Sequence, residues 1–223
     1  AKYLVGCDGG QSTVRGLIGA IMKGSSFNQN WLVVDVDKTC NFFRHTQVYC
    51  SPKRSSITLP GPHGIRRYEF KLKDGESSEK LGEDFIRKLL VSVGKDGKAK
   101  IRRSQVYQFH ALISSEWKKK SVAIAGDAAH LSPPFAGQGM NSGIRDVGNL
   151  GWKLALAIKK PKSKDILETY FLERKEHCWA LINLAIRMGQ IMVPKNRFSS
   201  FFIVSFFRLI KINKTLLNYV SQM

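Results

Sequence analysis

The sequence is short of acidic residues. Its 223 residues include 17 Asp and Glu against 36 Lys and Arg, which gives a formal net charge of +19. A surplus of this size attracts polyanions, so a nucleic-acid partner has to be considered. The basic residues, however, are scattered in short runs, without a zinc finger, an RNP aromatic pattern or a basic heptad helix. We therefore expect these runs to form solvated turns, with attraction of anionic ligands as the second possibility, and we expect no nucleic-acid partner.

Cysteine is scarce and long apolar runs are missing. The four cysteines form no C-x-x-C pair and lack a histidine at metal-ligand spacing, which argues against a metal site and a disulfide framework. No segment reaches the roughly 18 consecutive apolar residues of a membrane span. The chain opens on Ala1 with neither a leader pattern nor a Met, as the middle of a longer protein would. These absences predict a cytoplasmic protein without a membrane span.

What the sequence does contain is a strand–acid–glycine–helix stretch between Val122 and Ile158. It opens with four apolar residues, stops at Gly126-Asp127, passes through a loop rich in Pro and Gly, and enters a helical pattern near Asn141. Glycines let a backbone approach a ligand closely, and the free N–H groups of a first helical turn attract electron-rich groups. We expect a ligand site here, with the Asp127 carboxylate accepting hydrogen bonds from ligand hydroxyls.

A second stretch of the same kind lies at the start of the chain. An apolar run predicts a short buried strand, Asp8-Gly9 follows it, and Ser12 caps a helical turn that includes Arg15. Two such strand ends, side by side in one sheet, form a crevice of the kind in which α/β sheets bind ligands. The sequence thus predicts that Asp8 and Asp127 share one cleft; the alternative for each is a plain tight turn.

The segment between these two stretches has the pattern of an antiparallel sheet with one helix. Its strand-like parts are 31–36, 47–50, 55–59, 66–72 and 104–113, and its helical part is 79–93, with Ser78 as the cap. Four aromatic residues on these strands are candidates for the wall of a pocket for a flat substrate: Tyr68, Phe70, Tyr107 and Phe109. Residues of this kind more often form plain sheet core, and core is the favoured interpretation for each of them taken singly.

Two long helices and an apolar segment complete the pattern. The first helix runs from Asn141 to just before Pro161, and the second from about Lys164 to Met192. The apolar face predicted for the first helix consists of Ile144, Val147, Leu150, Leu154 and Ile158. The segment from Phe198 onward is too short to span a bilayer and too apolar for water, so we expect it to pack on the body of the protein or on a part outside this chain.

Together the two acid–glycine stretches resemble a known family, the FAD-dependent aromatic-ring hydroxylases, which are class A flavin monooxygenases. Residues 4–15, LVGCDGGQSTVR, are similar to the family's DG motif, and residues 125–141, AGDAAHLSPPFAGQGMN, are similar to its GD motif. Three segments between them look most like the branch that hydroxylates 3-(3-hydroxyphenyl)propionate and related phenols: 31–35, 66–70 and 106–111. The resemblance covers residue 1 to about residue 195.

The resemblance implies an α/β (α+β) fold in three parts. The first is part of a three-layer FAD-binding sheet domain, made of residues 1–29 and 116–160. The second is an inserted, mainly antiparallel substrate-binding sheet domain at 30–115, and the third is a set of C-terminal helices at 161–223.

The resemblance also implies roles for single residues. Asp127 would bind the ribityl chain of FAD, Pro133 would lie near the reactive edge of the ring, and the 137–141 backbone would donate to its pyrimidine edge. Asp8 and Arg15 would serve both FAD and NAD(P)H. The full implied FAD-binding set is Asp8, Gly9, Arg15, Gly126, Asp127, Ala128, His130, Pro133, Gly137, Gln138, Gly139, Met140 and Asn141.

The implied reaction is reduction of FAD by NADH or NADPH, addition of O₂ to give a flavin hydroperoxide, and transfer of one oxygen to a phenolic ring. His110, His130 and Tyr107 are candidates for a catalytic base, and none is assigned. Family members begin with a βαβ unit carrying G-x-G-x-x-G, which holds the FAD pyrophosphate and which no part of this sequence matches. We therefore expect a fragment, or a chain that needs an N-terminal segment or a second chain.

Two other readings of the sequence remain open. The chain could belong to another flavin oxidoreductase that shares the GD loop, such as a halogenase or a reductase. It could also be an inactive remnant that acts only as a binding module through exposed apolar surface.

Overall fold

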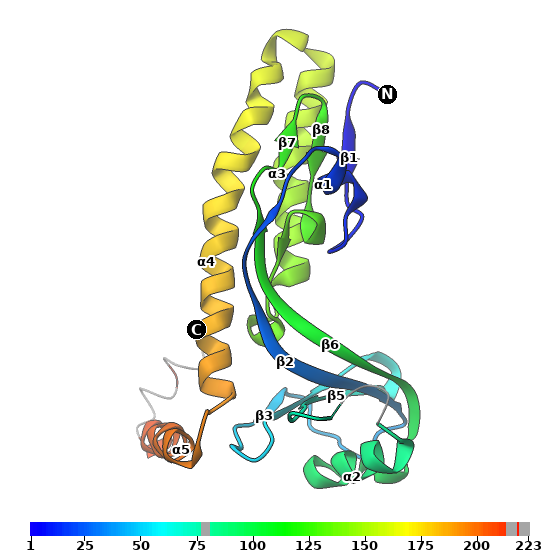
Figure 1. Ribbon diagram of the computed structural model, residues 1–223, viewed down its shortest axis with the longest axis vertical. Coiled ribbons are helices and arrows are strands. Elements are labelled where there is room, and N and C mark those ends of the chain that lie inside the picture. The colour runs from blue at the N-terminus through cyan, green and yellow to red at the C-terminus, as the bar shows by residue number, and fades with distance from the viewer. Residues whose placement is uncertain (77–80, 213–217, 219–223) are drawn as a thin grey trace. The chain divides into compact units, whose positions relative to one another are not determined.

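The structure, a computed structural model, describes residues 1–76, 81–212 and 218. It confirms the predicted mixed α/β fold with antiparallel strands and C-terminal helices (Figure 1). The chain divides into two compact units: unit 1 is Ala1–Asn28 with Phe109–Gly189, and unit 2 is Gln29–Gln108 with Gln190–Met223. The assignment of a substrate domain to residues 30–115 stays a prediction.

The elements of the two units are as follows. Unit 1 contains β1 (Leu4–Gly6), α1 (Thr13–Leu17), β7 (Lys118–Lys119), β8 (Val122–Ile124), β9 (His130–Leu131), α3 (Gly139–Lys159), a 3₁₀ segment (Pro161–Glu168) and most of α4 (Thr169–Met192). Unit 2 contains β3 (Gln47–Tyr49), β4 (Ser56–Pro60), β5 (Arg66–Lys71), α2 (Glu83–Val93) and α5 (Arg197–Ile212). The long strands β2 (Met22–Asp37) and β6 (Lys100–Ser114) each have residues in both units.

A small sheet in unit 1 brings the two acid–glycine stretches together. Its order is β1-β8-β7, and β1 runs parallel to β8 with Gly6 beside Ile124. Because the carboxyl ends of parallel neighbours meet at one edge of a sheet, the turns after Gly6 and after Ile124 are adjacent. The predicted adjacency of these two strand ends is confirmed.

The larger sheet has the order β3-β4-β5-β2-β6-β9. Within unit 1, the short strand β9 pairs with β6, with His130 opposite Ile113, and so ties the loop after β8 to this sheet. Within unit 2, β5 lies between β4 and β2, and α2 covers the sheet with Ile86, Leu89 and Leu90. Helix α2 begins at Glu83, and the predicted cap Ser78 lies outside the described residues.

Helix α3 has the predicted extent but buries a different face. The residues that it buries are Ser142, Asp146, Leu150, Lys153 and Ala157. Of the predicted apolar face, Ile144, Val147 and Ile158 are exposed, so this prediction is wrong for them. The reason is that the buried polar side chains have partners on the following segments: Arg174 donates to Asp146, and Lys153 donates to Thr169.

The C-terminal segments differ from expectation in two ways. The predicted helix from about Lys164 to Met192 is a 3₁₀ segment followed by α4, which packs beside α3 in unit 1 (Figure 1). Helix α5 packs on unit 2 only in part: Ile210 is buried and the Ser200 Oγ donates to the Cys50 carbonyl oxygen at 3.0 Å, while most of its large apolar side chains are exposed. No described helix is long and apolar enough to cross a membrane.

Candidate ligand site at the strand ends

A cavity of about 480 Å³ lies at the carboxyl ends of β1 and β8 in unit 1. It is lined by Cys7, Gly9, Ala125, Gly126, Asp127, Met140, Gly143, Ile144 and Val147. Both acid–glycine stretches and the first turns of α3 therefore contribute to one cavity. Four of the predicted site residues line it: Gly9, Gly126, Asp127 and Met140.

The turn at Gly126 lets helix α3 pack closely against it. Gly126 has a φ of +62°, a conformation that residues with a side chain rarely adopt. A Cβ atom at Gly143 would lie 3.3 Å from the Cα of Gly126, so glycine at this position lets α3 pack tightly against the turn. The next residue, Asp127, is exposed and makes no hydrogen bond or ion pair with another described residue. Its carboxylate is thus available to a ligand at the cavity.

The N-terminus of α3 is open. No side chain caps this helix, and a Cβ atom at Gly137 or Gly139 would meet no other atom within 4 Å. A 21-residue helix carries partial positive charge at its first turn, where the N–H groups lack helical acceptors. Three exposed residues of α3 give the cavity an apolar wall: Met140, Ile144 and Val147. The combination suits an electron-rich ligand with an apolar, flat part.

The buried carboxylate of Asp146 connects the Gly126 turn to the neighbouring elements. Asp146 is fully buried, and its Oδ2 accepts hydrogen bonds from the Gly126 amide at 3.0 Å and from His130 Nε2 at 2.7 Å. Its Oδ1 accepts a hydrogen bond from Arg174 Nε at 2.8 Å. Near by, the Cys178 Sγ lies 3.2 Å from the Ser142 Oγ. One side chain on α3 therefore fixes the Gly126 turn, β9 and α4 together.

The charges of this cluster follow from its hydrogen bonds. Burial alone would lower the pKa of His130, but its hydrogen bonds with Asp146 and Cys178 outweigh burial and raise that pKa to about 9. Burial would raise the pKa of Asp146, but His130 and Arg174 outweigh it and lower that pKa. At neutral pH, two cations and one anion leave one net positive charge behind the Gly126 turn. That charge favours an electron-rich or anionic ligand in the cavity.

Asp8 and Arg15 have structural partners. The Asp8 carboxylate accepts hydrogen bonds from Ser12 Oγ at 2.5 Å and from the Val14 amide at 3.0 Å, and these bonds hold its pKa below the usual value. Arg15 donates to the carbonyl oxygens of Gly10 at 2.8 Å and Ala128 at 3.0 Å. Asp8 thus organises the turn after β1, and Arg15 ties that turn to the loop after β8. Neither residue lines the cavity.

The other predicted FAD-binding residues do not line the cavity. Ala128, His130 and Pro133 are buried, and the His130 ring contacts Trp117. Gly137, Gln138, Gly139 and Asn141 form the loop that leads into α3. Sequence reasoning missed five lining residues: Cys7, Ala125, Gly143, Ile144 and Val147. For two of them the sequence contains a signal, because Ile144 and Val147 lie in the first turns of the helix that follows the glycine loop.

The predicted substrate aromatics separate into two groups. Tyr68 and Phe70 are fully buried in the core of unit 2, and the Tyr68 hydroxyl donates to Asp96 Oδ2 at 2.8 Å. They offer no surface to a ligand, so the pocket-wall interpretation is corrected to sheet core for these two. Tyr107 bonds Gln105 at 2.8 Å, and Phe109 packs edge-to-face on Phe135 at 5.7 Å. For Tyr107 and Phe109, a substrate role stays a prediction.

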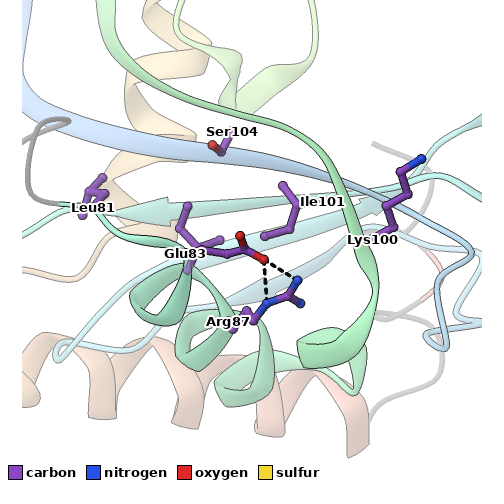
Figure 2. A pocket seen from close by; sticks show the side chains of 7 residues that line it. Leu81, Glu83, Arg87, Lys100, Ile101 and Ser104 are labelled. Carbon is purple, nitrogen blue, oxygen red and sulfur yellow. Dashed lines mark hydrogen bonds and ion pairs between the residues drawn. The ribbon is translucent and has the colours of Figure 1, made fainter.

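Two cavities in unit 2 contain no predicted site residue. One, of about 380 Å³, is lined by Leu81, Glu83, Ile86, Arg87, Lys100, Ile101 and Ser104 (Figure 2). Figure 2 shows Glu83 and Arg87 paired with each other, at 2.5 Å, so their charges are already neutralised. The other, of about 470 Å³, is lined by Cys40, Asn41, Phe42, Phe43, Gln47, Tyr49, Val93, Gly94 and Lys95. The strand-end cavity of unit 1 therefore remains the site that the sequence motifs indicate.

Residues 1–185 match a protein family described as FAD binding domain. The chain belongs to this FAD-binding family. The residues at the strand-end cavity fit FAD, because they offer an unpaired carboxylate, an uncapped helix N-terminus and an apolar wall. The predicted family and its cofactor, FAD, are thereby confirmed.

Curated relatives point to one branch of the family. The chain is 38% identical over 228 residues to a 3-(3-hydroxy-phenyl)propionate/3-hydroxycinnamic acid hydroxylase of Paraburkholderia xenovorans (strain LB400), covering 100% of this chain and 36% of the relative. It is also 38% identical over 199 residues to a protein of the same name from Mycolicibacterium gilvum (strain PYR-GCK), covering 88% of this chain and 35% of the relative. The chain thus spans little more than a third of the length of these relatives.

Solved structures agree on the fold. Aklavinone-11 hydroxylase in a ternary complex with FAD and aklavinone has a TM-score of 0.79 and 24% identity, covering 86% of this chain and 38% of that one. The p-nitrophenol 4-monooxygenase of Pseudomonas putida DLL-E4 has a TM-score of 0.85 and 19% identity, covering 99% of this chain and 57% of that one. Both likenesses establish the fold of an FAD-dependent hydroxylase.

Proposed function

We propose that this chain forms part of an FAD-dependent, NAD(P)H-using monooxygenase that hydroxylates a phenolic substrate. The observation that carries the proposal is the cavity at the ends of β1 and β8, where the unpaired Asp127 carboxylate and the uncapped end of α3 meet. Membership of the FAD-binding family and the names of the curated relatives support the same function.

The residues of the chain would bind and orient the cofactor. When bound, FAD supplies the redox chemistry between NADH or NADPH, O₂ and an aromatic ring. Asp127 accepts hydrogen bonds from hydroxyl groups of the ribityl chain, since it has no described partner of its own. The amides of Gly139, Met140 and Asn141 donate to the electron-rich edge of the ring system.

The surroundings of the cavity would tune that binding. Met140, Ile144 and Val147 exclude water from the ring, which strengthens the hydrogen bonds made beside them. The net positive charge of the cluster around Asp146 favours a ring that gains electrons. Arg15 keeps the two loops at a fixed separation through the Gly10 and Ala128 carbonyls.

Partners follow from the same proposal. The substrate is a small phenol of the 3-(3-hydroxyphenyl)propionate type, O₂ is the co-substrate, and an N-terminal segment or a second chain supplies the contacts to the FAD pyrophosphate. A pool of NADH or NADPH and the four free thiols fit a cytoplasmic location.

The test is FAD titration of the chain and of two variants, followed by flavin fluorescence. Asp127→Ala removes hydrogen bonds to a charged group and is expected to weaken FAD binding by about tenfold or more. Asp165→Ala, which removes an exposed carboxylate elsewhere in unit 1, is the matched control and should bind as the unmodified chain does. Equal affinity in all three proteins would refute the role of Asp127.

The reaction is tested in the full-length protein that carries these residues. Oxidation of NADH or NADPH should accelerate when 3-(3-hydroxyphenyl)propionate is added, and a hydroxylated product should form. Failure to bind FAD would contradict the proposed function as a whole. FAD binding without product from any phenol would contradict only the substrate class.

A further inference from the structure

Helix α5 presents an apolar surface that is open to solvent. Six of its apolar side chains have exposed fractions of 55% or more and lie on one side: Phe198, Phe201, Phe202, Phe206, Leu209 and Ile212. We refer to these six as the aromatic stripe. Burying such a surface releases free energy in proportion to its area, so the stripe needs a partner of some kind.

The stripe is continuous along the helix. Positions on an α-helix advance by about 100° per residue, so Phe198, Phe202 and Leu209 fall within about 40° of one another. The other three members border this group, Phe206 on one edge and Phe201 with Ile212 on the other. The rings also contact each other, because Phe202 meets Phe198 at 4.8 Å and Phe201 at 5.8 Å between ring centroids. The buried Ile210 lies beyond the Phe206 edge of the stripe, about 100° from Leu209 and about 120° from Phe198.

A basic flank runs beside the stripe. Arg197, Arg208 and Lys211 are exposed and fall within a sector about 60° wide. None of the three makes a hydrogen bond or ion pair with another residue in the described part of the chain. The sequence has no acidic residue after Glu176, so the helix carries no countercharge of its own. These three positive charges therefore favour an anionic partner.

We propose that α5 binds the surface of an anionic lipid bilayer and lies in the plane of that surface. The aromatic stripe would enter the boundary between headgroups and acyl chains, and the basic flank would contact the lipid phosphates. With 16 residues the helix is about 24 Å long, and no described helix qualifies as a membrane span, so α5 lies along the bilayer and does not cross it.

A second copy of the chain fits this surface less well. Pairing two α5 helices would bring two sets of Arg197, Arg208 and Lys211 close together, which costs free energy through like-charge repulsion. A stable dimer also buries about 800 Å² per partner. The projected face of a helix about 24 Å long and 10 Å wide is roughly 240 Å². A lipid surface, in contrast, supplies phosphates for the basic flank and needs no matching shape.

The experiment is co-sedimentation of the full 223-residue chain with vesicles. One set contains phosphatidylcholine alone, and the other contains phosphatidylcholine with phosphatidylserine. We expect binding to the second set at least tenfold tighter than to the first, and a steady loss of binding as salt is added. Equal binding to both sets, or no binding to either, would overturn the proposal.

Two double variants separate the stripe from the flank. Phe198→Ser with Phe202→Ser should reduce binding to the phosphatidylserine vesicles at least tenfold. Arg208→Gln with Lys211→Gln should reduce it by about 30-fold, since each basic residue at an anionic surface contributes about fivefold. All four positions are exposed, so the fold should persist, and circular dichroism checks this.

The matched controls lie outside α5. Val91→Ser removes an exposed apolar side chain from α2, and Lys162→Gln removes an exposed charge after α3; both should bind like the unmodified chain. Binding that survives both double variants would overturn the proposal. A dimer in solution that Phe198→Ser with Phe202→Ser dissociates, without any vesicle binding, would assign the stripe to a second copy and also overturn it.

Discussion

Asp146→Asn is the most informative single change to the proposed FAD site. The substitution keeps the size of the side chain but removes the carboxylate that accepts from Gly126, His130 and Arg174. Because Asp146 is fully buried, its loss leaves Arg174 as an uncompensated buried cation and removes the partner that keeps His130 protonated. Breaking a buried ion pair on one side typically costs about 3–5 kcal/mol of unfolding free energy.

The raised pKa of His130 gives a second measure of how much its pairing with Asp146 stabilises the folded chain. This pKa rises from 6.5 to about 9 on folding, a difference that corresponds to about 3 kcal/mol of unfolding free energy. Because the folded pKa lies above the unfolded one, this stabilisation is complete below pH 6.5 and is lost as the pH rises through about 9. Asp146 has the opposite sign, since its lowered pKa gives stability that is lost as the pH falls. Both contributions are therefore complete only between about pH 3.8, the ordinary pKa of an Asp, and pH 6.5, the ordinary pKa of a His, and they make the unmodified chain most stable in that range.

The assay is urea unfolding of the chain and of Asp146→Asn from pH 6 to pH 10, with Asp165→Asn as the exposed control. At pH 6 the Asp146 variant should lose about 3–5 kcal/mol and the control less than about 0.5 kcal/mol. Above pH 9 the difference between variant and unmodified chain should shrink, since His130 is then neutral in both. A loss below about 1 kcal/mol at pH 6, or a pH-independent loss, would refute the assigned charges.

Two further predictions concern the backbone of the site. Gly143→Ala should destabilise the chain by about 1–2 kcal/mol, because the new Cβ would press on Gly126. The control, Gly148→Ala on the same helix, has open space around the new Cβ and should stabilise the chain by about 0.5–1 kcal/mol. Urea midpoints that move in the same direction for both variants would contradict this packing. Arg15→Gln should weaken FAD binding several-fold in a fluorescence titration by releasing the carbonyls of Gly10 and Ala128, and unchanged affinity would show that the two loops keep their separation without it.

Local patterns in the sequence are sufficient to predict the strand, turn and helix that form the candidate site. An apolar run that ends in an acid and glycine, followed by a glycine loop and a helix, predicts the order of β8, the turn at Gly126 and α3. The same pattern at Asp8 predicts β1, and Ser12 accepts from the Arg15 amide as a helix cap does. These features depend on residues close together in the chain, which is why pattern and capping rules reach them.

The cluster behind the site could not be predicted in this way. Asp146 and Arg174 are 28 positions apart, and each is an ordinary surface residue by composition. Only tertiary packing shows that these two charges pair in the interior, and this pairing turns the buried face of α3 by about 100° from the predicted one. This shift of the buried face leaves Ile144 and Val147 exposed, where they line the cavity.

Strand lengths were the other failure of pattern rules. Strand β2 runs from Met22 to Asp37, although only residues 31–36 look like a strand in the sequence. The part before Trp31 is polar and is held in the sheet by pairing with β6, so its own residues give no signal.

The central claim is that FAD binds where the ends of β1 and β8 meet the first turn of α3. Hydrogen–deuterium exchange of the chain, measured with and without FAD, tests this claim most directly. We predict that FAD slows exchange at the amides of residues 126–128 and 139–141, and that Asp127→Ala removes the protection. Protection confined to unit 2, or bound FAD that leaves both loops unchanged, would contradict it.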